Sequence, residues 1–325
     1  MSNRPIKKQK TVKPIDINEY PVASRSDVYV TLFQSATGAP LNIPFIICRG
    51  SRPGPVLGLT AAVHGDELNG IKIIHNLAGK LDLEKLCGTL LCAPVVNVPA
   101  FRAGQRKFID QVDLNTVFPG KPAGVPAEQY AYAFSKTFLP VCDYLIDLHT
   151  ASQGRLNCLY VRADLKNAAV RDMALRINPE IILHVPGKDG TLRYAARQRK
   201  IPAITVEAGD PSVIQGEMVF EGEVGVRNVM ELLGMMPCDV CLTRTPVICK
   251  SSKWLRTKSG GLVHTYFGLA ERIKKKQLIA ETINVFGYSG DKYYAPYDGI
   301  VIGRAANPVA IPGMRYCHLG VEGQP

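Results

Sequence analysis

Hydrophobic and polar residues follow two different periods along the first 240 positions of the chain. A period of two, beginning at Asp27 and again at Ile43, predicts two strands that pair as an antiparallel hairpin at the edge of a sheet. After a turn predicted at residues 52–55, the apolar run 57–63 predicts a buried strand. Apolar residues three and four positions apart over residues 69–81 then predict a helix.

The same succession of strand and helix continues as far as residue 209. Apolar runs predict strands at residues 89–96, 141–149 and 204–207, and helical spacing predicts a helix at residues 127–139. Strands that alternate with helices are typical of an α/β fold, here a mainly parallel mixed sheet flanked by helices. Because ligands bind beyond the carboxyl ends of the strands in such sheets, we expect functional residues where these runs end.

The pattern changes at about Val240. Short strand candidates separated by glycines replace the helical spacing, and they predict a small C-terminal β-barrel domain. We therefore expect a flexible basic arm at residues 1–20, a larger α/β domain at residues 21–240 and the barrel at residues 241–325. The segment 235–239 is the expected joint between the two domains.

Composition places the chain among ordinary globular proteins. Its 325 residues are 46% hydrophobic and 21% charged, and no apolar run approaches the roughly 18 residues that a membrane-spanning helix needs. The basic N-terminus, with Lys7, Lys8 and Lys10, lacks the apolar stretch of a secretory signal. We therefore expect a cytoplasmic protein that does not enter a membrane.

The formal net charge of +11 suits an anionic partner. Lysine and arginine are mixed with turn residues and show no nucleic-acid-binding motif, so the charge favours an anionic small-molecule substrate over nucleic acid. The sequence does not decide the oligomeric state, and a homo-oligomer stays open.

Two histidines and a glutamate stand at the ends of apolar runs. His64 and Glu67, three positions apart, follow the run 57–63, and a later run closes with His149. Imidazole nitrogen and carboxylate oxygen are zinc ligands, and a catalytic zinc site uses three protein ligands and leaves one position for water. The sequence predicts one Zn²⁺ per chain on these three residues. We expect Asp147, on the same strand face as His149, to orient that imidazole, with an exposed edge position as the alternative.

Three further residues are candidates for catalysis and substrate binding. Glu207 closes another apolar run, where a carboxylate beside a metal could act as general acid and base, with a structural salt bridge as the alternative. Arg106 and Asn115 lie in a segment, 97–120, that reads as a long loop. Near a metal, Arg106 would stabilise an oxyanion and Asn115 would bind a substrate carboxylate or amide; for Arg106 a surface position is the alternative.

Four motifs in order resemble one known family. They are His64-Gly-Asp-Glu67, Asp113-Leu-Asn-Thr-Val-Phe-Pro-Gly120, Asp147-Leu-His149 and Val206-Glu-Ala-Gly209. Together they resemble the succinylglutamate desuccinylase/aspartoacylase family, which is related to the zinc carboxypeptidases. The resemblance covers roughly residues 40–235 and implies a zinc-hydrolase catalytic domain with a carboxypeptidase-like fold. In the C-terminal part, Lys258-Ser-Gly-Gly-Leu-Val and Ala295-Pro-Tyr-Asp-Gly-Ile-Val-Ile-Gly resemble the small lipoyl-like barrel of many family members.

By this resemblance, the roles of the candidate residues follow. The zinc ligands would be His64, Glu67 and His149, the general acid and base Glu207, the oxyanion donor Arg106 and the substrate contact Asn115. The family pattern usually continues Asp-Leu-Asn-Arg, whereas this chain has Thr116 at the last position, and we expect Thr116 to be a substrate-binding residue beside Asn115.

Thr116 affects the expected substrate. A hydroxyl cannot form the bidentate charged pair that arginine forms with a carboxylate. Either another basic residue, such as Arg102, Lys107 or Arg193, replaces the family arginine, or the substrate lacks that carboxylate.

These observations predict a zinc-dependent hydrolase that cleaves an amide bond of a small N-acyl amino acid or a related substrate by metal-activated water. Two alternatives stay open. One is a carboxypeptidase-like peptidase or an esterase that uses the same site. The other is a non-catalytic metal-binding scaffold.

Overall fold

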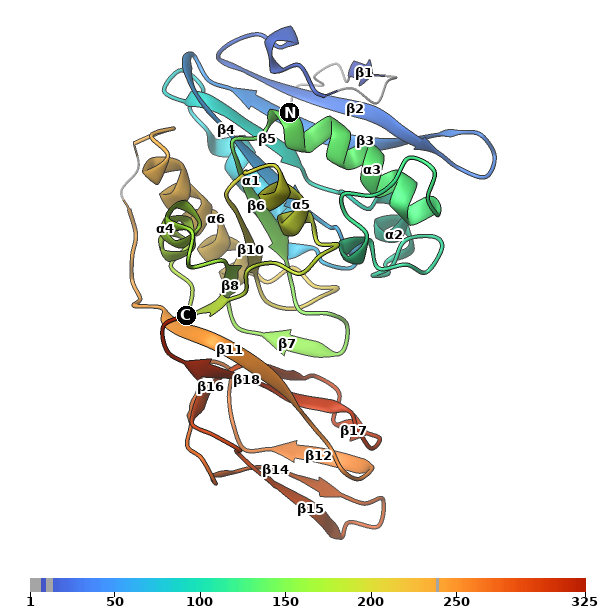
Figure 1. The fold of residues 1–325 in the computed structure, drawn as a ribbon, viewed down its shortest axis with the longest axis vertical. Coiled ribbons are helices and arrows are strands. Elements are labelled where there is room, and N and C mark those ends of the chain that lie inside the picture. The colour runs from blue at the N-terminus through green and yellow to red at the C-terminus, as the bar shows by residue number, and fades with distance from the viewer. Residues whose placement is uncertain (1–6, 10–13, 238–239) are drawn as a thin grey trace.

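A computed structural model describes residues 7–9, 14–237 and 240–325 of the chain, and one long mixed sheet runs through most of it (Figure 1). The strand order is β1-β2-β3-β5-β4-β6-β10-β8-β9, and it continues as β11-β18-β16-β13. The strands of the first part are β1 Lys7–Gln9, β2 Ser24–Gln34, β3 Pro40–Arg49, β4 Arg52–Ala61, β5 Cys87–Ala93, β6 Tyr144–His149, β7 Arg155–Asn157, β8 Tyr160–Ala163, β9 Ile181–His184 and β10 Ala203–Glu207.

The strand pairing confirms a mixed α/β fold. Strand β4 pairs in parallel with β5 and β6, and β6 pairs in parallel with β10. The predicted hairpin is confirmed as the antiparallel pair β2–β3. The turn predicted at residues 52–55 is wrong, because β4 begins at Arg52. Its prolines are tolerated because the pairing with β5 is irregular between Arg52 and Val56.

Helices cover both faces of the sheet (Figure 1). The predicted helices 69–81 and 127–139 are confirmed as α1 and α3, while the segment 97–120, predicted as loop, contains a short helix, α2, capped by Asn97. The helices are α1 Asn69–Lys80, α2 Val98–Ala103, α3 Pro126–Phe138, α4 Ala168–Arg176, α5 Leu192–Gln198 and α6 Gly216–Leu232, with short 3-10 turns at Ile17–Glu19, Leu114–Thr116 and Leu139–Val141. No helix in these described ranges is both long and apolar enough to cross a membrane.

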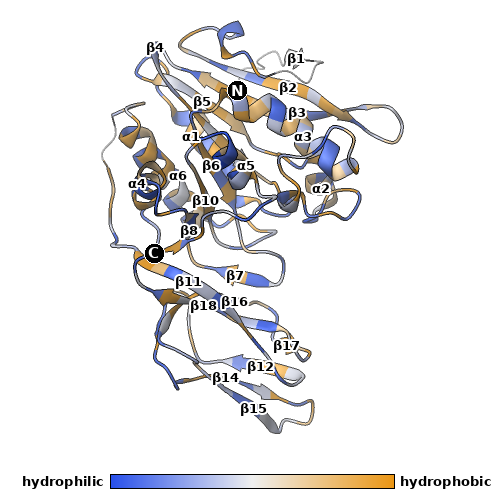
Figure 2. Cartoon of the chain, viewed as in Figure 1, coloured by the Kyte–Doolittle hydropathy of each residue, from blue (hydrophilic) through white to orange (hydrophobic). Residues whose placement is uncertain are grey.

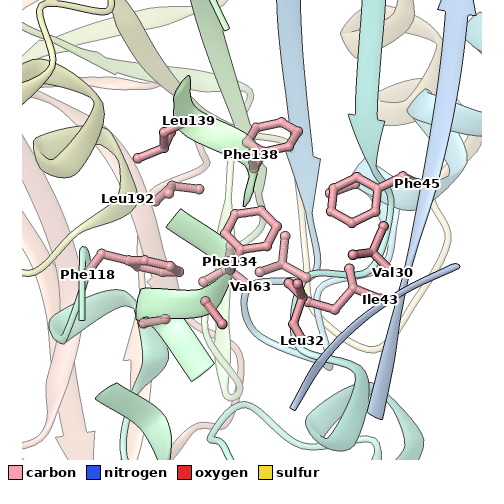
Figure 3. Close-up of a cluster of buried hydrophobic side chains, with 14 of the residues drawn as sticks. Val30, Leu32, Ile43, Phe45, Val63, Phe118, Phe134, Phe138, Leu139 and Leu192 are labelled. Atoms are coloured by element: carbon pink, nitrogen blue, oxygen red, sulfur yellow. The ribbon is translucent and has the colours of Figure 1, made fainter. Parts of the chain in front are cut away.

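Two hydrophobic clusters fix the helices to the sheet. On one face, Phe45 of β3 stacks against Phe134 and Phe138 of α3, with ring centroids 6.3 and 6.0 Å apart (Figure 3). In the other cluster, side chains of α1, α4 and α6 pack against side chains of the sheet strands. The described end of the predicted flexible arm belongs to the first cluster, because Ile15 and Tyr20 are buried there. That part of the arm is packed; residues 1–6 and 10–13 lie outside the described residues.

The C-terminal part is entirely β among its described residues (Figure 1). One group of strands extends the main sheet, because β11 pairs in parallel with β9, and β16 pairs with β7. The other group is a four-stranded sheet with the order β15-β14-β12-β17. Hydrophobic and hydrophilic residues both occur along these strands (Figure 2). The bounds are β11 Val247–Arg256, β12 Gly261–Thr265, β13 Arg272–Ile273, β14 Leu278–Ile283, β15 Ser289–Tyr294, β16 Gly299–Ala305, β17 Val309–Ala310 and β18 Arg315–Glu322.

This pairing refines the expected domain organisation. Small strands after residue 240 are confirmed, but they form two sheets, and one of these is continuous with the α/β part. Closure into a lipoyl-like barrel therefore stays a prediction. The predicted joint, 235–239, is described only as far as Pro237, because residues 238 and 239 lie outside the described residues.

Candidate active site

The three predicted metal ligands lie together at the carboxyl ends of β4 and β6. These strands are parallel neighbours, so the segment after β4, which carries His64 and Glu67, meets the end of β6, where His149 stands. One ligand atom from each side chain lies within 4.8 Å of the others, and all three side chains are buried. Gly65 is required in this segment, because a Cβ there would lie 2.1 Å from the carbonyl carbon of Ala100 in α2.

Both imidazoles turn the same ring nitrogen toward the centre of this group. Nδ1 of His64 and Nδ1 of His149 lie 3.2 Å apart, and each lies 2.8 Å from a carboxylate oxygen of Glu67. The opposite nitrogens, Nε2, contact other carboxylates: Asp147 at 2.8 Å from His149 and Asp113 at 3.0 Å from His64. A carboxylate that accepts the Nε2 proton leaves the Nδ1 lone pair free to bind a cation.

Asp147 occupies the predicted position, and Asp113 is an addition. Asp147 is buried, and its second oxygen accepts a hydrogen bond of 2.6 Å from the Thr60 hydroxyl, so the alternative of an exposed edge residue is wrong. Asp113 heads one of the four sequence motifs, yet the sequence reasoning gave it no role. Its position in the motif is the signal that could have identified it.

The electrostatics of the group favour a cation. Burial opposes protonation of His149, but the carboxylates of Asp147 and Glu67 outweigh it and raise its pKa well above the usual value. Burial would raise the pKa of Glu67, but His64 and His149 hold it well below its usual range. Two converging nitrogen lone pairs and a carboxylate are a donor set that suits zinc. The residues therefore fit the metal that the sequence predicts, and we call His64, Glu67, His149, Asp113 and Asp147 the ligand cluster.

Arg106 lies against the ligand cluster. Its Nη1 donates to Glu67 at 3.0 Å and to the Ser152 hydroxyl at 3.2 Å, while Nε and Nη2 donate to one oxygen of Asp113 at 3.1 and 2.9 Å. The Arg106 side chain is therefore half-buried against the ligand cluster, which argues against the surface position considered as the alternative. Fixed hydrogen bonds hold it beside the metal ligands, where a developing negative charge would be stabilised.

Glu207 stands beside His149 on the neighbouring strand. The two residues are direct partners in the parallel register of β10 and β6, and Glu207 is buried. Nε of Arg162 forms an ion pair of 3.0 Å with Oε1 of Glu207, and the same guanidinium contacts the Tyr160 hydroxyl at 2.7 Å. The salt bridge considered for Glu207 is therefore present. The Glu207 carboxylate also lines a cavity that it shares with the three candidate metal ligands.

One cavity of about 210 Å³ joins these groups, and we call it the site cavity. Asn115 lines it; its side-chain oxygen accepts a hydrogen bond of 2.9 Å from the Leu192 backbone at the start of α5, which leaves the amide nitrogen to offer to a ligand. Thr116 does not line it. Its side chain is exposed and donates to the Asp113 carbonyl at 2.6 Å, so the prediction that Thr116 binds substrate is not supported by its position.

Besides Arg106, four lysine and arginine side chains line the site cavity, and we call these four the basic wall: Arg155, Arg162, Lys188 and Arg193. Arg193 is 6% exposed, and its Nη1 donates to the Val185 carbonyl at 2.6 Å. Burial and the neighbouring Arg162 lower the pKa of Arg193 to about 10, so it remains a cation at neutral pH. Of the three basic residues that could replace the family arginine, only Arg193 lines the cavity, since Arg102 and Lys107 are exposed elsewhere.

The C-terminal strands supply two aromatic residues that the sequence reasoning missed. Trp254 of β11 and His318 of β18 line the site cavity and are direct cross-strand partners. Their rings stack with centroids 4.8 Å apart and planes 8° apart, and the Arg155 guanidinium lies 5.1 Å from the Trp254 ring. Burial and the surrounding arginines lower the pKa of His318 to about 3, so it is neutral.

Comparison with known protein families shows which family the chain belongs to. The family described as "Succinylglutamate desuccinylase/Aspartoacylase catalytic domain" matches residues 53–233, more than half of the chain. The chain belongs to this family. The family resemblance read from the four motifs is therefore confirmed. The matched range contains the whole ligand cluster, Arg106 and Glu207, whereas Trp254 and His318 lie beyond it.

Individual relatives match most of the length of the chain. N-alpha-acetyl-L-2,4-diaminobutyric acid deacetylase of Halomonas elongata is 26% identical over 285 residues, which are 83% of this chain and 83% of that protein. The product-bound structure of the ectoine utilization protein EutE (DoeB) from Ruegeria pomeroyi has 25% identity and a TM-score of 0.82, covering 92% of this chain and 95% of that one.

A second structure shows the shared fold. The succinylglutamate desuccinylase/aspartoacylase from Rhodobacter sphaeroides has a TM-score of 0.84 at 21% identity, covering 96% of this chain and 98% of that one. The chain is thus similar to deacylating hydrolases over its α/β part, and its fold is similar to theirs through the C-terminal strands as well.

Proposed function

We propose that this chain is a zinc-dependent deacylase that hydrolyses the amide bond of a small N-acyl amino acid. The observation that carries the proposal is the register of Glu207 against His149, because it puts a candidate proton carrier and a candidate metal ligand side by side in one cavity. Zn²⁺ held by His64, Glu67 and His149 would supply Lewis-acid polarisation of the carbonyl and a more acidic water molecule.

The chain's own residues account for the remaining steps. Glu207 takes a proton from the attacking water and returns it to the leaving amine. The Arg162 guanidinium keeps the Glu207 carboxylate in place through its ion pair of 3.0 Å. Arg106, held by Asp113 and Glu67, stabilises the negative charge that develops on the carbonyl oxygen.

The basic wall supports an anionic substrate. We propose that Arg193 binds the substrate carboxylate. Arg193 would thereby take the role of the arginine that the family usually has at position 116. Its Nε has no hydrogen-bond partner in the described part of the chain, and a buried guanidinium with an unused donor suits a carboxylate. Asn115, in the same cavity, offers its amide nitrogen to the acyl or carboxylate oxygen.

Cavity size favours small acyl amino acids over peptides. About 210 Å³ is below the roughly 300–1,000 Å³ typical of sites for drug-sized ligands. This argues against a carboxypeptidase-like peptidase, and the proton carrier Glu207 argues against a purely non-catalytic metal-binding scaffold. An esterase on the same site would use the same residues and is distinguished by substrate alone.

A metal analysis and a substrate screen test the proposal. Protein purified after growth with zinc is analysed for bound metal, then assayed with N-acetyl, N-succinyl and N-formyl amino acids by amine release. The acetylated diaminobutyrate named for the Halomonas elongata relative belongs in the screen. We expect one zinc per chain and a clear preference for one acyl amino acid, lost in Glu207→Gln. Substoichiometric zinc, or full activity of that variant, would falsify the proposal.

A further inference from the structure

Arg193 lines two cavities. One is the site cavity, and the other is a separate cavity of about 240 Å³, which we call the second cavity. Neither the ligand cluster nor Glu207 lines it. The second cavity is bounded by the end of β8, the start of α4, the start of β10 and helix α5. Its polar and apolar lining residues include Asp164, Arg193, Arg197, Lys200, Val170 and Ile201.

The charges of the second cavity are of both signs. Arg193 and Arg197 are four residues apart on α5, so both face the same side of the helix, and Lys200 follows shortly after it. Asp164 is the acidic lining residue. Nη1 of Arg197 donates to the Pro186 carbonyl at 2.7 Å and lies 3.8 Å from Oδ2 of Asp164, a distance that allows an ion pair but no hydrogen bond. Nε and Nη2 of Arg197 and Oδ2 of Asp164 therefore keep capacity for a ligand of opposite charge.

The remaining wall is apolar. Val170 of α4 and Ile201 and Ala203 at the start of β10 are buried, and they line the cavity together with Pro202. A ligand that satisfies the whole lining has a carboxylate for Arg197 and Lys200, an ammonium group for Asp164 and a short aliphatic side chain for the apolar wall. An aliphatic α-amino acid combines these three features in a molecule small enough for the volume.

We propose that the second cavity binds a small aliphatic α-amino acid and that this binding weakens the interaction of Arg193 with the substrate carboxylate. The coupling rests on the proposed function, in which Arg193 holds the substrate carboxylate. Arg193 is buried, its Nη1 is fixed on the Val185 carbonyl, and its Nε has no partner within the described ranges. A carboxylate in the second cavity places a negative charge near the Arg193 guanidinium. This negative charge weakens the electrostatic attraction between Arg193 and an anion in the site cavity. Because amide hydrolysis of an N-acyl amino acid releases an amino acid, the device would reduce substrate binding as product accumulates.

Calorimetry with L-leucine tests the site itself. The zinc-loaded chain is titrated with L-leucine, with 4-methylpentanoate, which lacks the ammonium group, and with isoamylamine, which lacks the carboxylate. We expect one molecule of L-leucine per chain and binding at least about tenfold weaker for either analogue, because each loses one charged contact. Equal binding of L-leucine and an analogue, or no binding of L-leucine, overturns the proposal.

Variants locate the bound amino acid. Asp164 and Lys200 line the second cavity but not the site cavity. The variants Asp164→Asn and Lys200→Gln should each weaken L-leucine binding about tenfold or more. Lys166→Gln is the matched control, since this exposed lysine is two residues from Asp164 and does not line the cavity. Undiminished binding in both Asp164→Asn and Lys200→Gln shows that L-leucine binds elsewhere and overturns the proposal. Calorimetry requires no turnover, so it decides the site even if the chain deacylates none of the substrates screened.

Kinetics tests the coupling. L-leucine should raise KM for the preferred acyl amino acid several-fold at unchanged kcat, both in the unmodified chain and in Lys166→Gln. In Lys200→Gln the same concentration should leave KM unchanged. An equal rise of KM in Lys200→Gln means simple product competition in the site cavity and overturns the coupling.

Discussion

His149 and His318 line the same cavity, yet their surroundings change their pKa values in opposite directions. Carboxylates of the ligand cluster raise the pKa of His149 despite its burial, while burial and arginines lower that of His318 to about 3. The ligand cluster is thus built to hold a cation, and the residues around the basic wall are built to hold an anion. The difference separates the two tasks of the proposed deacylase: activation of the reacting atoms and selection of the substrate.

The two regions also differ in how completely their groups are paired. Both imidazoles, Glu67, Asp113 and Asp147 each contact at least one partner within 3.0 Å. In the basic wall, Nε of Arg193 has no partner among the described residues. The ligand cluster is therefore a closed network, whereas Arg193 of the basic wall keeps one donor for a ligand.

Replacing Glu207 by glutamine tests the activation side and should give the largest effect. The amide keeps the size of the side chain but cannot carry the proton, so we expect kcat to fall by about 10²–10⁴. Zinc content should stay at the unmodified level, because Glu207 is not a ligand in the cluster. Elemental analysis beside the activity assay checks both points; loss of zinc in the variant would make Glu207 part of the metal site.

Asp113→Asn and Asp147→Asn test whether the carboxylates behind the histidines act through the metal. Each change removes the acceptor charge at one Nε2, and we expect zinc affinity to fall about 10–100-fold. Competition with a chromogenic chelator measures the affinity directly. Asp82→Asn, a substitution at an exposed surface carboxylate, is the control and should leave zinc affinity unchanged.

Arg193→Gln addresses the selection side. A charge-assisted hydrogen bond contributes about 1.5–3 kcal/mol, so KM for an acyl amino acid should rise roughly 10–100-fold with little change in kcat. The exposed Arg102→Gln is the matched control and should keep the KM of the unmodified chain. An unchanged KM in Arg193→Gln would assign the substrate carboxylate to another member of the basic wall.

His318 predicts a pH dependence of stability. Its pKa is about 3 in the folded chain, against roughly 6.5 when unfolded, so only the unfolded chain takes up this proton as the pH falls below 6.5. The contribution to stability is therefore complete above pH 6.5 and declines by about 1.4 kcal/mol per pH unit toward pH 3. Denaturant unfolding at pH 7 and pH 5 should give a difference about 2 kcal/mol smaller in His318→Gln than in the unmodified chain. Equal differences would mean that folding does not lower the pKa of His318.

Sequence reasoning selected three candidate metal ligands that do lie together, because strand ends are visible as the ends of apolar runs. His64, Glu67 and His149 each close or follow such a run, and parallel strands bring these ends together. The selection side was less visible. Arg162 and Tyr160 alternate along a four-residue strand that is too short to show its period, and Trp254 and His318 reach the cavity only through the pairing of β11 with β18.

The elements of the fold also divide into those that local sequence patterns predict and those that they do not. Helices α1 and α3 were predicted to within one residue at each end, since their apolar spacing persists over three turns, whereas α6, the longest of the described helices, was not predicted. Helix α2 has only six residues, too few for a period, and was predicted as loop. Continuity between the main sheet and the C-terminal strands depends on pairing over long distances in the chain, which local patterns do not encode.

The pairing of β7 with β16 limits how this enzyme could be re-engineered. The segment that carries Ser152 and Arg155 comes directly after His149 and is bound through β7 to Gly303 and its neighbours in β16. A chimera that exchanged the C-terminal strands for those of a relative would therefore also replace the support of that segment. Residues 150–160 and 299–305 should be transplanted as one unit, because the C-terminal part is not a modular appendage.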